Sequence, residues 1–431
     1  ESEGFGEAVG EAQEVLARYP FRVHQVPGNH DVGDKPDPTM PTLAVTAESL
    51  EQYHEWFGTS WDSFDHEGVH CVIVNSQILN STLPQALQQR QWLEHDLSQH
   101  EGQRIFMFTH LPVYLWNEHE PGLGHYDNID LPDRRWLLDL VRRYRVEMLF
   151  SAHVHWRFFD RIASTRYLVV PSPAFTRPGF SHMFSSNAPP ERGRDDTPKM
   201  GFLLVRVFGD RVDTHVIRTD GMTALPERIE SDKSKFLVTC TPANLPSSPL
   251  GVVLRGPLTP ASEVPAAWPS TISQKVRNDY PLLACLELGA RYLKTPSQLL
   301  SDALQHRHLI MLREEGVRIT ARSIWSDDEP IFATMERYAS GVDEWELQIP
   351  GGRPPTTAMK VMAHVRTKAG LPLAISPIFP NEIVEGKQHK RTRMGYRLDE
   401  LAELDRISEG DFQIDRILCR IDANQSPWSF F

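Results

Sequence analysis

The chain has 431 residues, which is long enough for two or three domains. A hydrophobic content of 40% and a charged content of 24% are ordinary for a globular protein, so a fibrous or disordered class is excluded. A formal net charge of −12 argues against non-specific nucleic-acid binding, which needs a basic surface.

The first half of the chain alternates predicted helices and strands. The apolar periodicity predicts helices at residues 7–19, 83–100 and 133–145. Apolar runs predict strands at residues 21–26, 68–76, 104–110, 146–152 and 167–173. Residues 201–218 alternate apolar and polar positions on both sides of a Phe-Gly-Asp turn, which indicates a β-hairpin. We therefore predict one α/β domain over residues 1–219, with a polar, Pro- and Gly-rich loop at 177–200.

Residues 220–270 are rich in Pro and Ser and predict a linker that contains short strands at 235–240 and 251–256. Further strands are predicted at 281–289, 317–325, 343–351, 371–380 and 414–422, and helices at 297–315, 328–340, 356–369 and 396–408. This alternation predicts a second α/β domain of parallel βα units over residues 271–431. An open doubly wound sheet would fit, but we favour a partial (β/α)-barrel, since a complete barrel needs about 250 residues.

The four cysteines lie far apart and none forms a CxxC pair, so we expect free thiols and a reducing, cytoplasmic location. No apolar run reaches the roughly 18 residues that a membrane-spanning helix needs, so no membrane association is expected. The acidic first residues do not resemble a signal peptide, and no Met opens the sequence. We expect the sequence to be a processed form or a fragment.

Three short polar blocks each follow a predicted strand. Asn29 and His30 lie in "GNHD", His110 ends "RIFMFTH", and His153 and His155 lie in "SAHVH". Because α/β folds carry ligand groups at the carboxyl ends of strands, we expect these side chains to meet. Imidazole nitrogens and an amide oxygen suit Zn²⁺, Mn²⁺ and Fe ions, so the blocks predict a metal site.

The same residue types suggest how a phosphoryl group would be handled. His30 would lie near the phosphate and protonate a leaving alkoxide, and Asp31 could orient its imidazole. If the extended pleat continued through "SAHVH", His153 and His155 would project to the same face. Two metal ions about 3.5–4 Å apart can hold a phosphoryl group and activate a water for in-line displacement.

The ordered blocks "GNHD", "FTHLP" and "SAHVH" resemble the calcineurin-like metallophosphoesterase superfamily. The sequence around "NSQ" at residues 75–77 is similar to its calcineurin-like phosphoesterase-domain protein branch, and the resemblance covers about residues 7–219. It implies a four-layer α/β/β/α sandwich, two divalent ions (Mn, Fe or Zn), and a phosphomonoester or phosphodiester substrate. It also implies that His30 is the acid or phosphate-stabilising residue, supported by Asp31.

The resemblance implies that Asn29, His110 and His153 bind the second metal and that His155 binds the first. The chain departs from the family pattern at Ala152, where the family has glycine. An alanine there would cost about 1 kcal/mol if the backbone needed a positive φ. A larger departure is that nothing before Val26 matches the family's Asp-x-His and Gly-Asp-x-x-Asp blocks. We therefore expect a truncated sandwich that binds the first metal poorly and has impaired activity.

Two other functions remain open. A catalytically inactive phosphoesterase fold could serve as a scaffold or binding module joined to a separate α/β domain. The second domain could also be the main enzyme, since Glu287, Arg322, Glu346 and Gln348 fall in or near strand ends. The sequence leaves the oligomeric state open.

Other polar residues receive structural interpretations. Surface or packing roles are expected for His24, His54, His66 and His70, which show no ligand spacing. Solvent-loop roles are favoured for His119 and His125 over a substrate loop, and Arg177 and His182 are weaker candidates for phosphate contact. Asp127 and Asp130 could replace missing carboxylate ligands, although we do not favour this.

Overall fold

The computed structural model describes residues 5–37, 42–121, 126–176, 199–219, 251–265, 273–326, 331–383, 388–401, 414–421 and 426. The chain divides into two compact units. The first comprises Glu1–Cys240 and Pro260–Tyr280, and the second comprises Thr241–Thr259 and Pro281–Phe431. The boundaries at 219 and 270 stay predictions. The strand predicted at 235–240, most of the loop at 177–200 with Arg177 and His182, and most of the helix at 396–408 lie outside the described residues.

The first unit is built on a six-stranded sheet with the order β1-β2-β3-β4-β6-β5. Its strands are β1 (Asp62–His66), β2 (Val69–Val74), β3 (Arg104–Thr109), β4 (Met148–Ser151), β5 (Phe158–Ile162) and β6 (Thr165–Val169). The four inner strands are parallel, while β1 and β5 pair antiparallel at the two edges. Every residue of β2 and β4 is buried, as expected for parallel strands covered on both faces.

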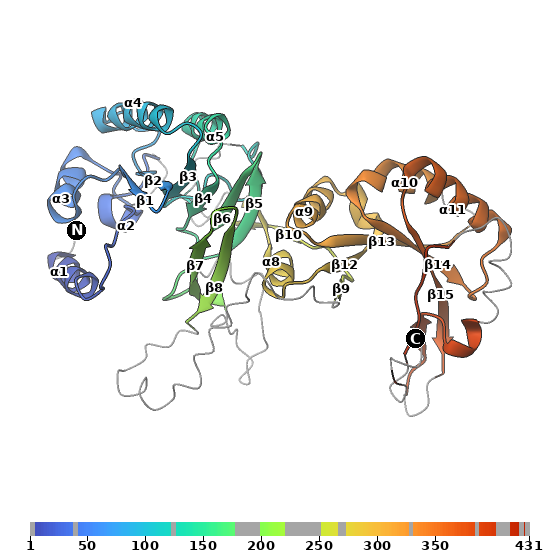
Figure 1. Ribbon diagram of the computed structural model, residues 1–431. Helices are drawn as coiled ribbons and strands as arrows, with labels where there is room; N and C mark the ends of the chain where they lie inside the picture. Colours follow the sequence, from blue (N-terminus) through green and yellow to red (C-terminus); the bar gives the residue numbers. More distant parts are fainter. Residues whose placement is uncertain are drawn as a thin grey trace. The chain divides into compact units, whose positions relative to one another are not determined.

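Helices α4 (Pro84–Gln99) and α5 (Asp133–Arg143) lie on one face of this sheet, and the hairpin β7–β8 lies on the other (Figure 1). The hairpin comprises β7 (Gly201–Val207) and β8 (Val212–Arg218), which confirms the predicted turn. Side chains of β3 alternate between the faces: Ile105 and Met107 join the core with α4 and α5, while Phe106 and Phe108 point to the hairpin side. The described residues thus form helix, sheet and hairpin layers.

The segment before this sheet differs from the prediction. Helix α1 (Phe5–Leu16) confirms the helix expected at 7–19, but residues 21–26 form no strand. This segment lies beside β1, where the His24 ring stacks on Phe64 with centroids 3.5 Å apart. A run of apolar residues becomes a strand only when a backbone partner is available, and here the position beside β2 is taken by β1. The short helix α2 (Asn29–Val32) and α3 (Ala47–Phe57) follow.

A further strand pair, β10 (Ala261–Pro265) and β11 (Ser273–Arg277), belongs to the first unit. Arg277 is fully buried and pairs with Asp160 of β5 at 2.7 Å and with Asp279 at 2.9 Å. Asp279 also accepts a hydrogen bond from the backbone N–H of Phe159 at 3.0 Å. These charged contacts attach β11 to the edge of the main sheet.

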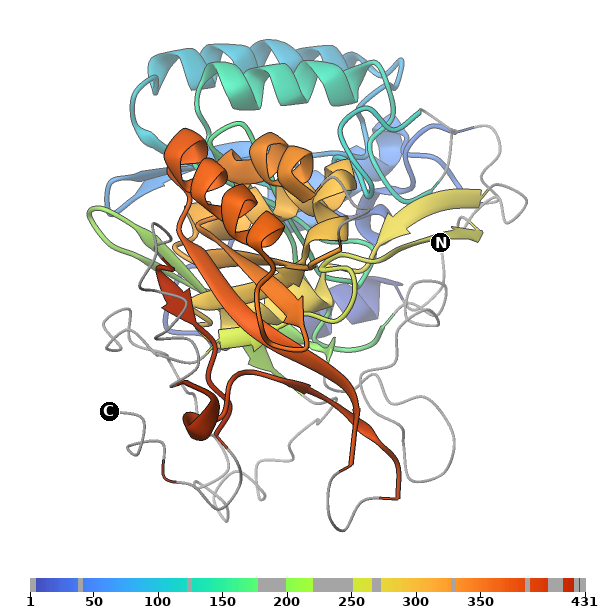
Figure 2. The same ribbon diagram turned by 90° about the vertical axis from the view of Figure 1, so that its right-hand side faces the viewer.

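The second unit contains a sheet with the order β16-β15-β14-β13-β12-β9, and β17 pairs with β15. Its strands are β9 (Gly251–Val253), β12 (Tyr292–Pro296), β13 (Arg318–Ile324), β14 (Glu344–Pro350), β15 (Leu373–Glu382), β16 (Arg391–Met394) and β17 (Arg416–Ile417). The strands β9, β12, β13, β14 and β15 are parallel, which confirms the expected βα units. The sheet curls as a half-barrel, and α9 (Ala303–Glu314), α10 (Ile331–Tyr338) and α11 (Thr356–Ala369) cover one face (Figure 2).

The strand predicted at 281–289 is wrong, since Tyr280–Glu287 form helix α8. Its buried residues Leu282, Leu283 and Cys285 fit a buried helix as well as a strand, because a short apolar run does not distinguish the two. Pro281 at the start of the helix also favours this conformation. Among the described residues, no helix has the length and apolar character required to cross a membrane.

Candidate functional site

The structure brings three of the predicted ligands into one cluster. His110 Nε2 lies 3.0 Å from Asn29 Oδ1 and 3.0 Å from His153 Nδ1. Asn29 opens α2, His110 follows the carboxyl end of β3, and His153 follows the carboxyl end of β4. Separations near 3 Å are those of neighbouring ligands around one metal ion, so the donor atoms fit a transition metal.

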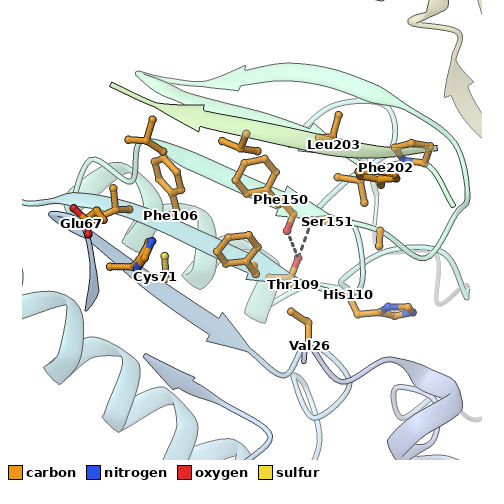
Figure 3. Close-up of a pocket in the computed structure, with 18 residues that line it drawn as sticks. Val26, Glu67, Cys71, Phe106, Thr109, His110, Phe150, Ser151, Phe202 and Leu203 are labelled. Atoms are coloured by element: carbon orange, nitrogen blue, oxygen red, sulfur yellow. Dashed lines mark hydrogen bonds between the residues drawn. The ribbon is translucent and has the colours of Figure 1, made fainter. Parts of the chain in front are cut away.

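The backbone around this cluster fixes the position of His110. Its carbonyl accepts a hydrogen bond from the N–H of Ala152 at 2.9 Å, which joins the ends of β3 and β4. The hydroxyls of Thr109 and Ser151 lie 2.7 Å apart directly before the two histidine segments (Figure 3). A Cβ on Gly28 would lie only 2.8 Å from His110 Cε1, so the close approach of the first block requires glycine.

The segment "SAHVH" does not continue the pleat of β4. His153 and His155 have φ values of 64° and 52°, in the left-handed region that side chains other than Gly seldom adopt. Such strained positions persist where the surrounding structure enforces them, often at functional sites. The condition under which both side chains would project to the same face, an extended pleat, is therefore not met. Ala152 is not among the residues with positive φ, so its replacement of the family glycine costs nothing at this position.

Burial gives His110 the character of a neutral ligand. The pKa of His110 is lowered to about 4, mainly by burial and to a smaller extent by the nearby His155 and His30. At neutral pH the ring is uncharged, and one nitrogen lone pair is available to a cation. His155 lies on the same turn, with its ring edge against Phe175 at a centroid distance of 4.3 Å.

His30 and Asp31 occupy the first turn of α2. His30 is exposed, close enough for its charge to act on both His110 and Asp31. The Asp31 carboxylate accepts a hydrogen bond from the Gly28 N–H at 2.7 Å. In the described part of the chain no hydrogen bond joins Asp31 to the His30 ring. Asp31 therefore stabilises the backbone turn at Gly28, which precedes Asn29.

Tyr126 is a site residue that the sequence did not predict. Its hydroxyl accepts a hydrogen bond from Asn29 Nδ2 at 2.7 Å, and its carbonyl lies 3.2 Å from His153 Nε2. The Asn29 amide is thereby oriented with Oδ1 toward His110, and one ring nitrogen of His153 is directed away from the cluster. Tyr126 lies in the loop after β3 that also contains His119. Its position in that loop is the only sequence feature that could have indicated a role at the site.

The acidic residues of this loop have other partners. Asp130 forms an ion pair with the buried Lys35 at 2.7 Å, and Asp127 accepts a hydrogen bond from Gln274 at 2.6 Å. No Asp or Glu among the described residues lies within 4.8 Å of the ligand atoms of both His110 and His153. The structure thus gives no support to Asp127 or Asp130 as replacement ligands.

The polar residues proposed in the second unit mostly make structural contacts. Glu346 is buried, pairs with Lys294, and accepts a hydrogen bond from Ser376 at 2.5 Å. Gln348 donates to Glu346 at 3.3 Å, and Arg322 donates to the carbonyl of Leu254 at 3.0 Å. These partners account for the buried polar groups of the sheet.

An apolar cavity of about 690 Å³ lies between the main sheet and the β7–β8 hairpin. Phe106, Phe150 and Leu203 line it, and His110 stands at one end (Figure 3). The cavity therefore connects the candidate metal cluster with the space between the two sheet layers.

Comparisons with known proteins match the first part of the chain. Residues 4–157 match the calcineurin-like phosphoesterase family. The serine/threonine-protein phosphatase CPPED1 of Homo sapiens is 33% identical over 138 residues, which is 30% of this chain and 40% of the relative. The Danio rerio protein of the same name is 32% identical over 137 residues. The chain thus spans about two fifths of the length of the curated relatives it matches.

A solved structure titled "GAP50 the anchor in the inner membrane complex of Plasmodium" is similar to 38% of this chain and 52% of its own chain. Its sequence identity is 14% and its TM-score is 0.26.

Proposed function

Because residues 4–157 belong to the calcineurin-like phosphoesterase family, we propose that this chain carries the metal-binding part of a metal-dependent phosphoesterase. The reaction is the hydrolysis of a phosphomonoester or phosphodiester. The observation that carries the proposal is the convergence of Asn29 Oδ1, His110 Nε2 and His153 Nδ1 at separations of 3.0 Å.

Asn29, His110 and His153 would hold one divalent ion, and His155 would contribute to a second. Bound metal ions would supply Lewis-acid stabilisation of the phosphoryl oxygens. His30 is exposed beside this cluster, so an incoming phosphate ester can approach its imidazole. In its protonated form His30 would donate a proton to the leaving alkoxide. Tyr126 would hold the Asn29 amide in the orientation that presents its oxygen.

We also propose that the chain binds the first metal weakly and has reduced activity. Two cations held close together need anionic ligands between them, because their mutual repulsion is large when no negative charge intervenes. Among the described residues, no carboxylate lies near both His110 and His153. The four-layer sandwich expected for the family remains part of this proposal, since the described residues supply three of its layers.

The names of the relatives suggest the first substrates to test. CPPED1 is named a serine/threonine-protein phosphatase. Phosphoserine and phosphothreonine peptides are therefore proposed substrates, alongside a generic aryl phosphate.

The test measures manganese and zinc binding by calorimetry and phosphate release from these esters, for the full chain and for H110A and N29A. We expect each substitution to lower metal affinity at least tenfold and to remove phosphate release. Replacing the exposed His119 in H119A should change neither quantity. Metal binding that is equal in all four proteins would contradict the proposed site. Metal binding at the site without turnover of any ester would instead favour the inactive scaffold or binding module.

A further inference from the structure

The loop between β3 and α5, hereafter the site loop, carries Tyr126 to the candidate site. It comprises residues 110–132 and is described at 110–121 and 126–132. Tyr126 contacts two proposed metal ligands: its hydroxyl accepts a hydrogen bond from the Asn29 amide at 2.7 Å, and its ring centroid lies 4.5 Å from that of His153. Because Tyr126 orients these ligands, any residue that holds this part of the loop also acts on the site.

Strand β11 holds the site loop at the residue next to Tyr126. Gln274 Nε2 donates a hydrogen bond of 2.6 Å to Asp127 Oδ2. Both residues are buried, with Gln274 6% exposed and Asp127 0% exposed. A short hydrogen bond to a carboxylate is strong in such surroundings, because water does not compete for either group. Asp127 follows Tyr126 directly in the chain, so this bond limits the movement of the Tyr126 backbone.

Two further residues of β11 contact the outgoing part of the same loop. Arg277 Nη1 donates to the carbonyl of Trp116 at 3.0 Å, and Lys275 Nζ lies 4.1 Å from the centroid of the Trp116 ring. Successive side chains of a strand point in opposite directions, so Gln274 can reach the returning part of the loop. Since Arg277 is also paired with Asp160 of β5 at 2.7 Å, the main sheet fixes β11 as a support for the loop.

We propose that Gln274 is a positioning residue for the candidate metal site, an inference that rests on the proposed function. Through Asp127 it holds Tyr126 at the place where the tyrosine hydroxyl orients the Asn29 amide. Loss of this hydrogen bond would remove a donor from a buried carboxylate, and the loop would shift to bring that carboxylate another partner. Asn29 would then present its oxygen less well to the metal.

The sequence pattern assigns residues 273–277 to the predicted second domain, away from the metal-binding blocks. The compact first unit includes Pro260–Tyr280, so β11 lies in the same unit as the candidate site. No local spacing joins Gln274 to Asp127, because the two are 147 positions apart and meet only in the folded chain. A positioning role for Gln274 could therefore not be predicted from the sequence.

The test exchanges the donor and the acceptor of this hydrogen bond in the full chain. Q274E places a second carboxylate beside Asp127, and their repulsion should move the loop and weaken manganese binding about tenfold. In the double variant Q274E/D127N an amide at position 127 donates to the new carboxylate, so manganese affinity should return to that of D127N. Calorimetric titration of the metal-free proteins with manganese chloride measures the affinity. Q91E makes the same change on the exposed face of α4 and should bind manganese as the wild type does.

Hydrogen exchange in the metal-free protein gives a second readout that does not depend on activity. Within the site loop the N–H of Ile129 donates to the carbonyl of Pro112 at 2.9 Å. Q274E should speed the exchange of this amide, and the added D127N should reverse the change. Equally faster exchange throughout the first unit would show a general loss of stability and would overturn the positioning role.

Circular dichroism checks the fold of each variant, and if Q274E is unfolded, Q274M removes the donor without adding a charge. Wild-type manganese affinity in Q274E or Q274M, together with weakened binding in N29A, would overturn the positioning role and leave the proposed function intact. A double variant that is weaker than D127N by the factor separating Q274E from the wild type would overturn it as well. Equal manganese binding by the wild type and N29A would instead contradict the proposed function, and the positioning role with it.

Discussion

At the scale of single residues, the burial of His110 makes the free energy of unfolding depend on pH. The pKa of His110 is lowered to about 4 in the folded protein, against about 6.5 in an unfolded chain. Below pH 6.5 the unfolded chain therefore binds a proton that the folded protein does not. The contribution of His110 to the free energy of unfolding is fully present above pH 6.5. It is lost as the pH falls to about 4, and the loss amounts to roughly 3 kcal/mol.

Urea unfolding of the metal-free protein at pH 7.5 and pH 4.5 measures this effect. We expect the loss of stability between the two pH values to be smaller by about 2–3 kcal/mol in H110Q than in the wild type. H119Q, which changes an exposed histidine, serves as the control and should lose as much as the wild type. An equal loss in H110Q would show that His110 is not buried as a neutral ring.

The sequence predicted which residues of the main cluster meet, because the blocks follow strands that end at one edge of a parallel sheet. It did not predict Tyr126, whose contacts are made after a loop of the chain returns to the site. Nor did it predict the positive φ of His153 and His155, since histidine adopts this conformation more often than most residues but still in only a small minority of positions. The local sequence pattern therefore predicts which residues come together, but tertiary contacts decide their geometry.

At the scale of elements, the buried Arg277 decides how β11 is held in the first unit. Replacing it in R277M would leave Asp160 and Asp279 buried without their counter-charge. Removing one partner of a buried ion pair typically costs about 3–5 kcal/mol. Urea unfolding should show a loss of this size. K275M removes the neighbouring exposed cation that lies 4.1 Å from the Trp116 ring, and should cost less than about 1 kcal/mol. Equal losses in both variants would contradict this role.

The elements with long periodic patterns were predicted well, whereas some of the shorter elements were missed or assigned to the wrong type. The apolar stripes of α4, α5 and α11 and the apolar runs of β2, β3, β13 and β14 identified these elements. The error at 281–289 arose because eight apolar-rich residues fit either a helix or a strand. The edge strand β5 was missed because its charged residues Asp160 and Arg161 hide the apolar pattern.

At the scale of the whole molecule, two units with separate buried cores predict more than one unfolding transition. In the second unit, Lys294 neutralises the buried Glu346. K294M should lower the temperature of the calorimetric transition of the second unit, and R277M should lower that of the first unit. K360M changes an exposed lysine of α11 and should leave both transition temperatures unchanged. If K294M and R277M both shift every transition equally, the chain unfolds as a single cooperative body.

The cavity between the main sheet and the hairpin also affects how a dye-binding assay would report the folded state in solution. Its lining of Phe106, Phe150 and Leu203 resembles the apolar surface that fluorescent dyes such as ANS detect. A native molecule with such a cavity would bind the dye without any loss of tertiary packing. Dye fluorescence alone would thus misreport this protein as a molten globule, whereas near-ultraviolet circular dichroism from its ten tryptophans would report the ordered core directly.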